Sequence, residues 1–562
     1  MNYVSSFSGM VLLVGLMLAA IPQAIAQGPQ YACRVRLADK SGSPAVSNPS
    51  AFLTARALAR RSRLGISVTD EDRPVAPRYI DSLVRLSGGV LHTTSRWFNE
   101  VTLLLPDSSS LPTLRTKSWV LGTKVVGYYS GGLHLRTAAP LPETQQQDAY
   151  TRLPTLKTAG SAAYYGATWS QTSLVKGDAL HDAGYTGAGL LIAIADDNFD
   201  GLTTHPGFAA LRASGRIVDS FNFVQRSASG VFNGYSHGTG VLSNIVGFQP
   251  NSYVGAAPQA SVALYSTENQ FQDQQVEMDQ LVAALERADS IGADLMSLSI
   301  GYNIFDYPST TEYPWSAFDG KTTPVAQAAN RATAKGMLIV SCAGNEGNSN
   351  WGKLLTPGDA DSALTIGSVA SNGSPAQTSS FGPNASGRVK PDVCGMGEGA
   401  AYFNAGGTIS NGNGTSYSTP QIAGFAACLW SAFPNRQPGE IRNAINRSAN
   451  RYSNPDIQIG YGIPNFSTAF QALGIAGAEP LPETLTAYYS SFKNELVLTA
   501  PDATGITLQL YNLVGSRLAK ADLQTGGTQP VRWSLPEQIT PGIYLLHYST
   551  ATQQGTLKIA VP

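Results

Sequence analysis

The sequence predicts an α/β protein whose central part is a parallel sheet covered by helices on both faces. Continuous apolar runs such as LLIAIA, residues 190–195, are typical of buried parallel strands. Between residues 160 and 474 these runs alternate with segments of helical periodicity, which favours helices on both sides of one sheet. A smaller region with a β-α-β-β-α-β pattern precedes this part, and only short strands follow it. We therefore expect an α+β unit, a three-layer α/β domain and a small β-sandwich, in that order.

Length and charge limit the classes of protein to which the chain could belong. At roughly 100–200 residues per domain, 562 residues correspond to about three or four domains. The chain has 37 Lys and Arg and 38 Asp and Glu, a net charge of −1, and it lacks the basic patch expected of a nucleic-acid-binding protein. Charged residues make up 13%, whereas about 25% is usual for soluble proteins. Together with 57 Gly and 24 Tyr, this composition suggests a compact, loop-rich, exported protein.

The four cysteines predict neither a disulfide scaffold nor a cysteine-based metal site. They are Cys33, Cys342, Cys394 and Cys428, and no CxxC motif occurs. Most of them lie in apolar or tightly packed segments, so we expect buried free thiols. A single disulfide is the alternative, and the sequence alone does not assign it.

Residues 1–26 resemble a secretory signal peptide. Residues 11–21 (VLLVGLMLAAI) have the length of a signal h-region and are too few to span a bilayer. Ala24-Ile25-Ala26 provides a small-x-small cleavage site, so the mature chain is expected to begin near Gln27. The first eight residues contain no Lys or Arg, which departs from the usual pattern. A buried N-terminal helix is the alternative. No later apolar run is long enough to span a membrane.

Residues 27–145 are expected to form the α+β unit and a linker. The expected elements are a strand at 31–37, a helix at 79–86, two strands within 90–105, a short helix at 110–116 and a strand at 119–129. This order is typical of a ferredoxin-like fold. The basic segment RALARRSR, residues 56–63, interrupts it as an insertion. Residues 137–147 are rich in Pro and Gln, which is typical of a linker.

Residues 160–474 carry the alternation of strands and helices. Strands are expected at 190–195, 261–265, 295–300, 337–342 and 363–369, and helices at 276–289 and 324–335. Pro324 near the start of the second helix and Gly336 just after its end are typical of helix boundaries. Active sites of such sheets lie at the carboxyl ends of the strands, so polar residues there are candidates for chemistry.

Residues 478–562 are expected to form the β-sandwich. Pro480-Leu481-Pro482 marks the joint with the preceding domain. Short strands separated by turns are expected at 495–499, 507–511, 531–534, 542–548 and 556–561.

The segment GYSHG, residues 234–238, fits two different motifs. As G-x-S-x-G it would make Ser236 the nucleophile of an α/β-hydrolase elbow, which requires an apolar strand before it and an Asp and a His after it. The preceding segment is polar and Gly-rich, and the only histidine after His237 is His547, in the C-terminal β region. The pattern therefore favours His237 as a catalytic base over Ser236 as a nucleophile.

A base needs a nucleophile to activate and a carboxylate to orient it. Asp196 directly follows the LLIAIA run, where an open α/β sheet places functional groups. Ser416 lies in GNGTSYSTPQIAG, where a Gly-rich turn leads into an apolar helix. A serine at such a junction has an exposed hydroxyl, and its backbone N–H points to the place where an oxyanion would form.

At these residues the chain resembles the subtilisin-like serine proteases, the subtilases (peptidase family S8). The Asp motif is IAIADDNFDG, the His motif is HGTGVLS followed by VGAAP, and GTSYSTPQIAG closely matches the Ser motif Gly-Thr-Ser-x-[Ser/Ala]-x-Pro. SCAGNEG, FGP and KPDV lie between them, as in the family. The resemblance covers about residues 165–472. The Asp, His and Ser motifs and SCAGNEG, which makes the fourth, occur in the family's order, and this makes the resemblance specific.

The resemblance implies a role for each matching residue. Ser416 would be the nucleophile, His237 the general base and acid, and Asp196 the residue that orients the imidazole. Asn345 would donate to the oxyanion together with the Ser416 N–H. Ser299-Ile300-Gly301 stands where the family pairs with an extended substrate by β-augmentation. A buried strand end is the alternative for that segment.

The family resemblance implies protein or peptide substrates and a reaction that needs no cofactor. Structural calcium is common among subtilases, but the sequence shows no cluster of ligands to which a metal could be assigned. An inactive surface adhesin or binding protein on the same fold is the alternative to a secreted endopeptidase, and a peptidase of narrow processing specificity is a second enzymatic possibility.

The Asp motif departs from the family, which usually has Asp-[Ser/Thr/Ala]-Gly. Here Asp196 is followed by Asp197 and Asn198, and we expect Asn198 to adopt the left-handed conformation of the missing glycine. Asp197 is a second candidate for the orienting role, although strand register favours Asp196. Ser297 also departs, standing where many members have Asn.

The flanking regions resemble modules that accompany exported proteases. The N-terminal unit resembles a subtilase propeptide in position and pattern. The C-terminal region resembles the type A sorting domain of the Bacteroidetes type IX secretion system, including a Gly-x-Tyr strand at residues 542–544. The sequence therefore predicts a protein that is secreted or attached to the outer cell surface and that interacts with that machinery. A β-sandwich that binds substrate or glycan is the alternative.

Overall fold

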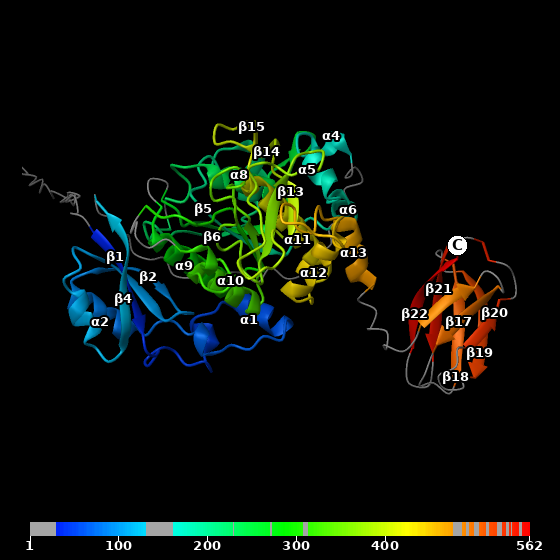
Figure 1. Ribbon diagram of the computed structural model, residues 1–562, viewed down its shortest axis with the longest axis horizontal. Helices are drawn as coiled ribbons and strands as arrows, with labels where there is room; N and C mark the ends of the chain where they lie inside the picture. The colour runs from blue at the N-terminus through cyan, green and yellow to red at the C-terminus, as the bar shows by residue number, and fades with distance from the viewer. Residues whose placement is uncertain are drawn as a thin grey trace, which may run out of the picture.

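The structure is a computed structural model, and it describes most of the chain (Figure 1). The described residues are 30–130, 161–228, 230–269, 273–306, 313–475, 486–490, 494–499, 505–512, 516–524, 531–535, 539–540, 542–549 and 554–561. The predicted signal peptide and the predicted linker at residues 137–147 lie outside these residues.

The N-terminal unit is a four-stranded antiparallel sheet with two helices. Its elements are β1 (Gln30–Leu37), α2 (Pro77–Ser87), β2 (Val90–Ser95), β3 (Glu100–Leu105), α3 (Leu111–Arg115) and β4 (Val120–Tyr129). The strand order β2-β3-β1-β4, with every neighbouring pair antiparallel, is that of the ferredoxin-like fold. Apolar side chains of the sheet, such as Val35 and Leu103, pack with Leu83 of α2 and Leu114 of α3.

The basic insertion forms the helix α1 (Ala55–Arg63), flanked by the short 3-10 helices η1 (Pro49–Ala51) and η2 (Asp70–Asp72). Thr54 caps α1, because its side chain accepts a hydrogen bond from the Ala57 N–H. The helix lies against the central domain, beside α9 (Gln275–Ile291) (Figure 1). The sequence predicted an insertion here but gave no indication of what it contacts.

The central domain is built on a seven-stranded sheet in which all neighbouring strands are parallel. The strand order is β13-β12-β11-β10-β5-β9-β6. The strands are β5 (Leu191–Asp196), β6 (Ile217–Asn222), β9 (Ser261–Ser266), β10 (Leu295–Leu298), β11 (Leu338–Cys342), β12 (Leu364–Val369) and β13 (Val393–Met396). The sequence pattern did not identify β6 or β13, which are the two edges of the sheet.

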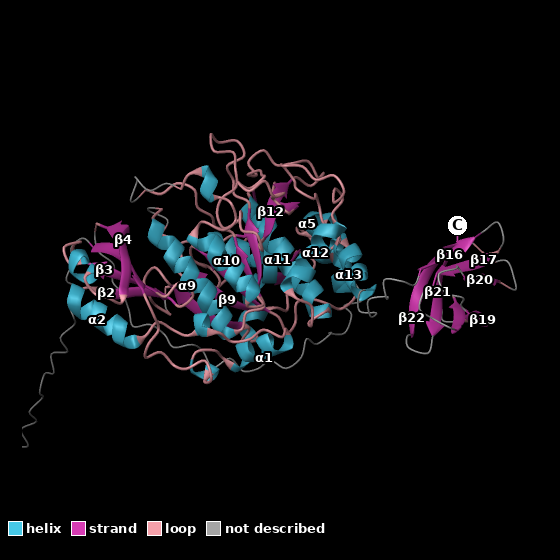
Figure 2. Ribbon diagram, turned by 60° about the horizontal axis from the view of Figure 1, so that its bottom comes forward, coloured by secondary structure: helices cyan, strands magenta, loops and turns pink. Residues whose placement is uncertain are grey.

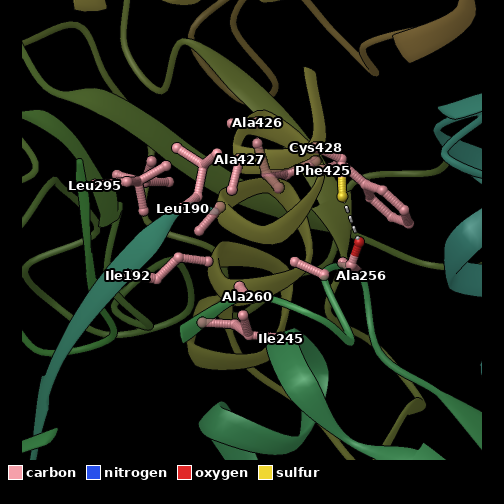
Figure 3. Close-up of a cluster of buried hydrophobic side chains, with 14 of the residues drawn as sticks. Leu190, Ile192, Ile245, Ala256, Ala260, Leu295, Phe425, Ala426, Ala427 and Cys428 are labelled. Carbon is pink, nitrogen blue, oxygen red and sulfur yellow. Dashed lines mark hydrogen bonds between the residues drawn. The ribbon is translucent and has the colours of Figure 1, made fainter. Parts of the chain in front are cut away.

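Side chains of β5 alternate between two cores, as strand geometry requires. Ile192 and Ile194 face a core that also contains residues of α8 (His237–Val246) and α11 (Thr415–Ala432). Figure 3 shows Ile192 in this core with Ala426 and Ala427 of α11. Leu191 and Ala193 face a second core with residues of α9 and of α10 (Pro324–Ala334). The predicted three-layer fold class is therefore confirmed.

The other elements of the domain are short or lie at its periphery. They are α4 (Ala162–Tyr165), α5 (Trp169–Leu174), α6 (Asp178–Asp182), η3 (Pro206–Phe208), α7 (Ala209–Ala213), β7 (Phe248–Gln249), β8 (Tyr253–Val254), η4 (Trp315–Ala317), β14 (Ala400–Phe403), β15 (Ile409–Gly412), α12 (Pro438–Ser448) and α13 (Phe466–Ile475). All four cysteines are buried free thiols. Within the described residues, no helix is both long and apolar enough to cross a membrane.

The C-terminal region forms two antiparallel sheets, β16-β17-β20 and β19-β18-β21-β22 (Figure 2). The strands are β16 (Thr486–Ser490), β17 (Glu495–Thr499), β18 (Gly505–Tyr511), β19 (Arg517–Gln524), β20 (Val531–Ser534), β21 (Gly542–Ser549) and β22 (Gln554–Val561). Leu498 and Trp533 of one sheet share a core with Leu508, Leu546 and Tyr548 of the other, which makes the region a β-sandwich. The sequence pattern did not identify β16 or β19.

Gly424 offers a test of the packing between α11 and the loop that follows β8. A Cβ atom built at Gly424 would lie 2.6 Å from the Ala256 Cβ, so the two segments approach too closely for a larger residue. We expect Gly424→Ala to lower the melting temperature, since overpacking of a core typically costs about 1–3 kcal/mol. Gly439→Ala in α12 is the control, because its added Cβ meets nothing within 4 Å. Circular dichroism would compare the two variants, and equal melting temperatures would contradict this account of the packing.

Candidate active site

Asp196, His237 and Ser416 lie at the ends of three buried elements. Asp196 is the last residue of β5, His237 is the first residue of α8, and Ser416 is the second residue of α11. The two helices pack against each other and on the same face of the sheet as Ile192 and Ile194. The fold therefore brings the carboxyl end of a central strand together with the N-termini of two helices.

Asp196 and His237 form a short hydrogen bond. The distance between His237 Nδ1 and Asp196 Oδ1 is 2.6 Å, and the side chains are 36% and 1% exposed, respectively. Burial tends to lower the pKa of His237, but the charge of Asp196 and its hydrogen bond outweigh burial and raise that pKa to about 9. The bond uses Nδ1 and so leaves Nε2 as the nitrogen for an exchange of protons with a nucleophile.

The Ser416 hydroxyl makes a different contact from the one that the sequence predicts. In the described part of the chain, Ser416 Oγ donates to the Ser299 carbonyl over 3.3 Å, and Ser299 Oγ donates to the Ser416 carbonyl over 3.0 Å. Ser416 is 7% exposed. Catalytic hydrogen bonds are often loose or misaligned before substrate binds, and rotation about the Cα–Cβ bond redirects the hydroxyl.

Asn345 is held by Thr415, the residue before Ser416. Its Oδ1 accepts from the Thr415 N–H over 2.8 Å and from the Thr415 hydroxyl over 3.0 Å. This anchoring fixes the orientation of the amide and leaves Nδ2 as its donor. The Ser416 N–H lies in the first turn of α11, where backbone donors have no acceptor within the helix. The sequence analysis missed Thr415 as the anchor, because nothing in the motif indicates which group holds the amide.

Comparison with known proteins identifies the central domain. Residues 187–462 match the Subtilase family, and residues 32–132 match the Peptidase S8 propeptide domain of Bacteroidota. Residues 187–462 are a subtilase domain. Together with the similarity to the subtilisins described next, this makes the chain a serine endopeptidase with protein substrates.

Similar proteins each cover about half of the chain. Subtilisin DY of Bacillus licheniformis is 27% identical over 300 residues, which are 53% of this chain and 97% of that protein. Subtilisin E of Bacillus subtilis (strain 168) is 27% identical over 303 residues, covering 53% and 70%. Among solved structures, MycP1 with its N-terminal propeptide removed gives a TM-score of 0.42 at 21% identity, covering 54% of this chain and 96% of that chain.

The segment after β10 lies beside Ser416. Strand β10 ends at Leu298, so the prediction of a strand to residue 300 was wrong by two residues. Ser299 is tied to Ser416 by the two hydrogen bonds described above, and the Ile300 carbonyl accepts from Cys342 Sγ over 3.4 Å. A Cβ at Gly301 would lie 2.8 Å from the Leu355 Cβ, so a larger residue there would force one of the two segments to shift.

The hydrogen bond to His237 Nδ1 comes from Asp196, and the Asp197 carboxylate bonds the backbone of α8. This carboxylate accepts from the backbone N–H groups of His237 and Gly238, over 3.3 and 3.0 Å. The expectation for Asn198 was wrong, because its φ is not positive and its Nδ2 donates to the Asn233 carbonyl instead. The left-handed residue of this loop is Gly201, with a φ of 86°.

The side chains at the candidate active site do not suit a calcium ion. Among the described residues, the one group of three potential metal ligands that lie within reach of one another is Asp196, Asp197 and His237. Calcium takes six to eight oxygen ligands. One of these three groups is an imidazole, and the carboxylates are already engaged with the imidazole and with backbone N–H groups. We therefore assign no metal ligand.

The N-terminal unit covers the outer face of the subtilase domain at α9. Asp289 of α9 is fully buried, and Arg60, Arg61 and Arg96 of the N-terminal unit lie 2.5, 2.7 and 2.8 Å from its carboxylate. Glu286 accepts from the Ser95 hydroxyl and from the backbone N–H groups of Arg96 and Trp97.

Two further acidic residues pair with arginines of the N-terminal unit. Asp294 pairs with Arg56 and Arg63, and Asp279 with Arg34. The insertion helix α1 thus supplies four of the six arginines that cross the interface here.

Asp196→Asn tests the cause of the raised pKa of His237. Without the negative charge we expect the pKa to fall by at least one unit, measured by NMR titration of the imidazole. The stability that the pair contributes is fully present below about pH 6.5, the ordinary pKa, and is lost as the pH rises towards about 9. Asp200→Asn is the control, because among the described residues its carboxylate accepts a hydrogen bond from the adjacent Gly201 N–H and makes no other that is seen. An unchanged His237 titration in Asp196→Asn would refute this cause.

Proposed function

We propose that the chain is a secreted serine endopeptidase that cleaves peptide bonds through Asp196, His237 and Ser416. The observation that carries this proposal is the Asp196–His237 hydrogen bond at the end of β5, together with the packing of the start of α11 near it: the ring centre of Tyr417, the residue after Ser416, lies 6.3 Å from that of His237. The match of residues 187–462 to the Subtilase family supports it.

In the proposed mechanism, the Ser416 hydroxyl attacks the scissile carbonyl while its proton passes to His237 Nε2. His237 then gives this proton to the leaving amine, and an acyl-enzyme remains on Ser416. Water attacks the ester in the second half, with His237 again taking and returning a proton. Asp196 holds the imidazole and stabilises its charged form. Because only the neutral imidazole accepts a proton, turnover should rise with pH through the pKa of His237.

The tetrahedral intermediates would be stabilised by two donors. Asn345 Nδ2 is oriented by the contact of Oδ1 with Thr415, and the Ser416 N–H lies at the positive end of α11. Loss of one such donor typically lowers turnover about 10²- to 10³-fold. Ser299-Ile300-Gly301, which follows β10 and contacts Ser416, would pair with the backbone of an extended substrate.

The N-terminal unit, residues 27–145 with its linker, would assist folding and block the active site until it is removed. Its match to a peptidase S8 propeptide domain supports this role. Two hydrogen bonds between the end of β4 and the start of α9 also support it. The Tyr128 N–H donates to Gln274 Oε1, and Gln274 Nε2 donates to the Tyr128 carbonyl. The subtilase domain itself would span residues 160–474.

Export would use both ends of the chain. Residues 1–26 would serve as a signal peptide, and residues 478–562 would be recognised by type IX secretion machinery and then removed or anchored. The support for this is the sequence pattern of the C-terminal β-sandwich together with the Bacteroidota propeptide match. The mature protein would then act outside the cell or on its outer surface.

Ser416→Ala tests the proposed nucleophile. In protein comprising residues 27–562, we expect the wild type to cut itself near residues 130–165 and then to hydrolyse a peptide substrate. Ser416→Ala should stay intact and inactive, as followed by gel electrophoresis and N-terminal sequencing. Ser418→Ala, in the same helix, is the matched control, because the family motif allows alanine there. Equal processing of wild type and Ser416→Ala would contradict the proposed role.

The double variant Arg60→Ala and Arg61→Ala tests the propeptide role of α1. Removing one side of a buried ion pair typically costs about 3–5 kcal/mol, so we expect the N-terminal unit to be released and peptide hydrolysis to begin after a shorter lag. Size-exclusion chromatography of the self-cleaved chain would show whether the two fragments elute together. Arg85→Ala is the control, since Arg85 is an exposed residue of α2. If the double variant fails to fold, Arg56→Ala at the edge of the interface replaces it. An unchanged lag would contradict the proposal.

Deletion of residues 478–562 tests the proposed sorting role. In a host with type IX machinery, we expect the shortened chain to accumulate in the periplasm, as measured by immunoblotting of cell fractions. The full-length Ser416→Ala chain should be exported like the wild type, which separates export from activity. Normal export of the deletion variant would leave the rival function, binding of substrate or glycan, as the better account of the β-sandwich.

A further inference from the structure

Asp197 contacts the backbone at the point where α8 begins. Its carboxylate is buried, with 4% of the residue exposed. Oδ2 accepts from the His237 N–H over 3.3 Å, and Oδ1 accepts from the Gly238 N–H over 3.0 Å. These are the first two residues of α8, and the first N–H groups of a helix have no acceptor within it. Asp197 therefore supplies acceptors that the helix lacks.

The residue at the usual capping position does not perform this task. Ser236 is the N-cap of α8, and its side chain makes no capping hydrogen bond. A carboxylate about 40 positions earlier in the chain takes its place, and its negative charge also suits the positive end of the helix. If the Asp197 carboxylate were removed, the buried Gly238 N–H would lose its acceptor, which is unfavourable.

The backbone of Asp197 also contacts Asp196, the residue that bonds the His237 imidazole. The Asp197 N–H donates to Asp196 Oδ1 over 2.9 Å, and this is the oxygen that accepts from His237 Nδ1. Asp196 Oδ2 is buried and has no hydrogen-bond partner among the described residues. One residue thus orients the Asp196 carboxylate through its N–H and holds the His237 backbone through its side chain.

The junction is too closely packed to tolerate much movement. A Cβ at Gly238 would lie 2.7 Å from the Asn198 carbonyl oxygen and 3.1 Å from the Asp196 Cβ. The loop after β5 and the first turn of α8 therefore approach each other as closely as glycine allows. This contact places the Asp197 carboxylate within reach of both N–H groups.

We propose that Asp197 is a positioning residue, which fixes the start of α8 so that the His237 imidazole stays in line with Asp196. This inference rests on the proposed function of Asp196 and His237. The hydrogen bond to His237 Nδ1 comes from Asp196, whereas the hydrogen bonds described above join the Asp197 carboxylate to the backbone of α8, so the proposed role differs from the orienting role of Asp196. Asp197 acts through the backbone on which the histidine is carried.

The charge of Asp197 affects the pKa of His237, which can be measured. A residue that only stabilised the fold would not change this pKa. Within the described ranges, the titratable side chains that face His237 are Asp196 at the end of β5, Asp197 next to it, and Tyr417 of α11, whose ring centre lies 6.3 Å from that of His237. Burial, and then the charge of Asp196, raise the pKa of Asp197 to about 7. When ionised, Asp197 adds to the attraction that raises the pKa of His237. Removing its charge should therefore lower that pKa.

The test compares Asp197→Ala and Asp197→Asn in the full-length chain, with hydrolysis of a peptide substrate measured between pH 5 and 10. For Asp197→Ala we expect kcat to fall about 10- to 100-fold with KM within about twofold, because small misplacements of a catalytic group have effects of this size. The acidic limb of the kcat/KM profile should also move to lower pH. Asp197→Asn keeps one acceptor oxygen, so it should recover most of kcat while keeping the shifted limb.

Controls separate this inference from the proposed function. Asp200→Asn, three residues further along the loop, should match the wild type in kcat and in pH profile. If the wild type itself is inactive, the proposed function fails. If the wild type is active and Asp197→Ala keeps both its kcat and its pH profile, the inference is overturned. If Asp197→Ala does not fold, Asp197→Asn decides the matter: an unshifted acidic limb would overturn the inference.

Discussion

A buried carboxylate at the end of a central strand sets the constraint that the rest of the structure serves. Asp196 lies at the carboxyl end of β5, almost fully buried, and its charge is balanced by an imidazole 2.6 Å away. A buried charge without a partner is strongly unfavourable, so α8 must begin where His237 can reach Asp196. The parallel sheet provides the edge, and the packing of α8 on α11 brings the ring centre of Tyr417, the residue after Ser416, to 6.3 Å from that of His237. Fold and proposed chemistry depend on the same contact.

A second set of buried charges joins the N-terminal unit to the subtilase domain. The carboxylates of α9 and of the turn after it are matched by arginines, most of which come from α1. Such pairs contribute little net stability relative to apolar contacts, but breaking one leaves an uncompensated charge. Forming these pairs therefore adds little stability, whereas breaking one is costly. This suits an interface that must hold the N-terminal unit in one orientation. It also explains why the insertion is basic in a chain with few charges overall.

The sequence predicted what depends on buried apolar runs and on short motifs. The run before Asp196 and the motifs around His237 and Ser416 are local patterns. Asp196 lies at the end of the expected strand and Ser416 at the start of the expected helix, whereas no element was predicted for His237. The edge strand β6 was missed because it is partly polar, and β13 because it has only 4 residues and contains glycine, so periodicity does not distinguish them from loops. The partners of α1 on α9 lie more than 200 positions away, and no local pattern indicates them. The contact of Ser416 with Ser299 likewise depends on a rotamer, which a motif does not specify.

The most direct measurement of the central claim is the site at which a fluorophosphonate reacts. Such a reagent attaches covalently to a serine only when a base activates its hydroxyl, and mass spectrometry of peptides locates the attachment. The account predicts modification at Ser416, at a rate that falls sharply in Asp196→Asn and in His237→Ala. Modification of another serine, such as Ser236, or the same rate in all three proteins, would contradict the assignment of Asp196, His237 and Ser416 as one catalytic unit.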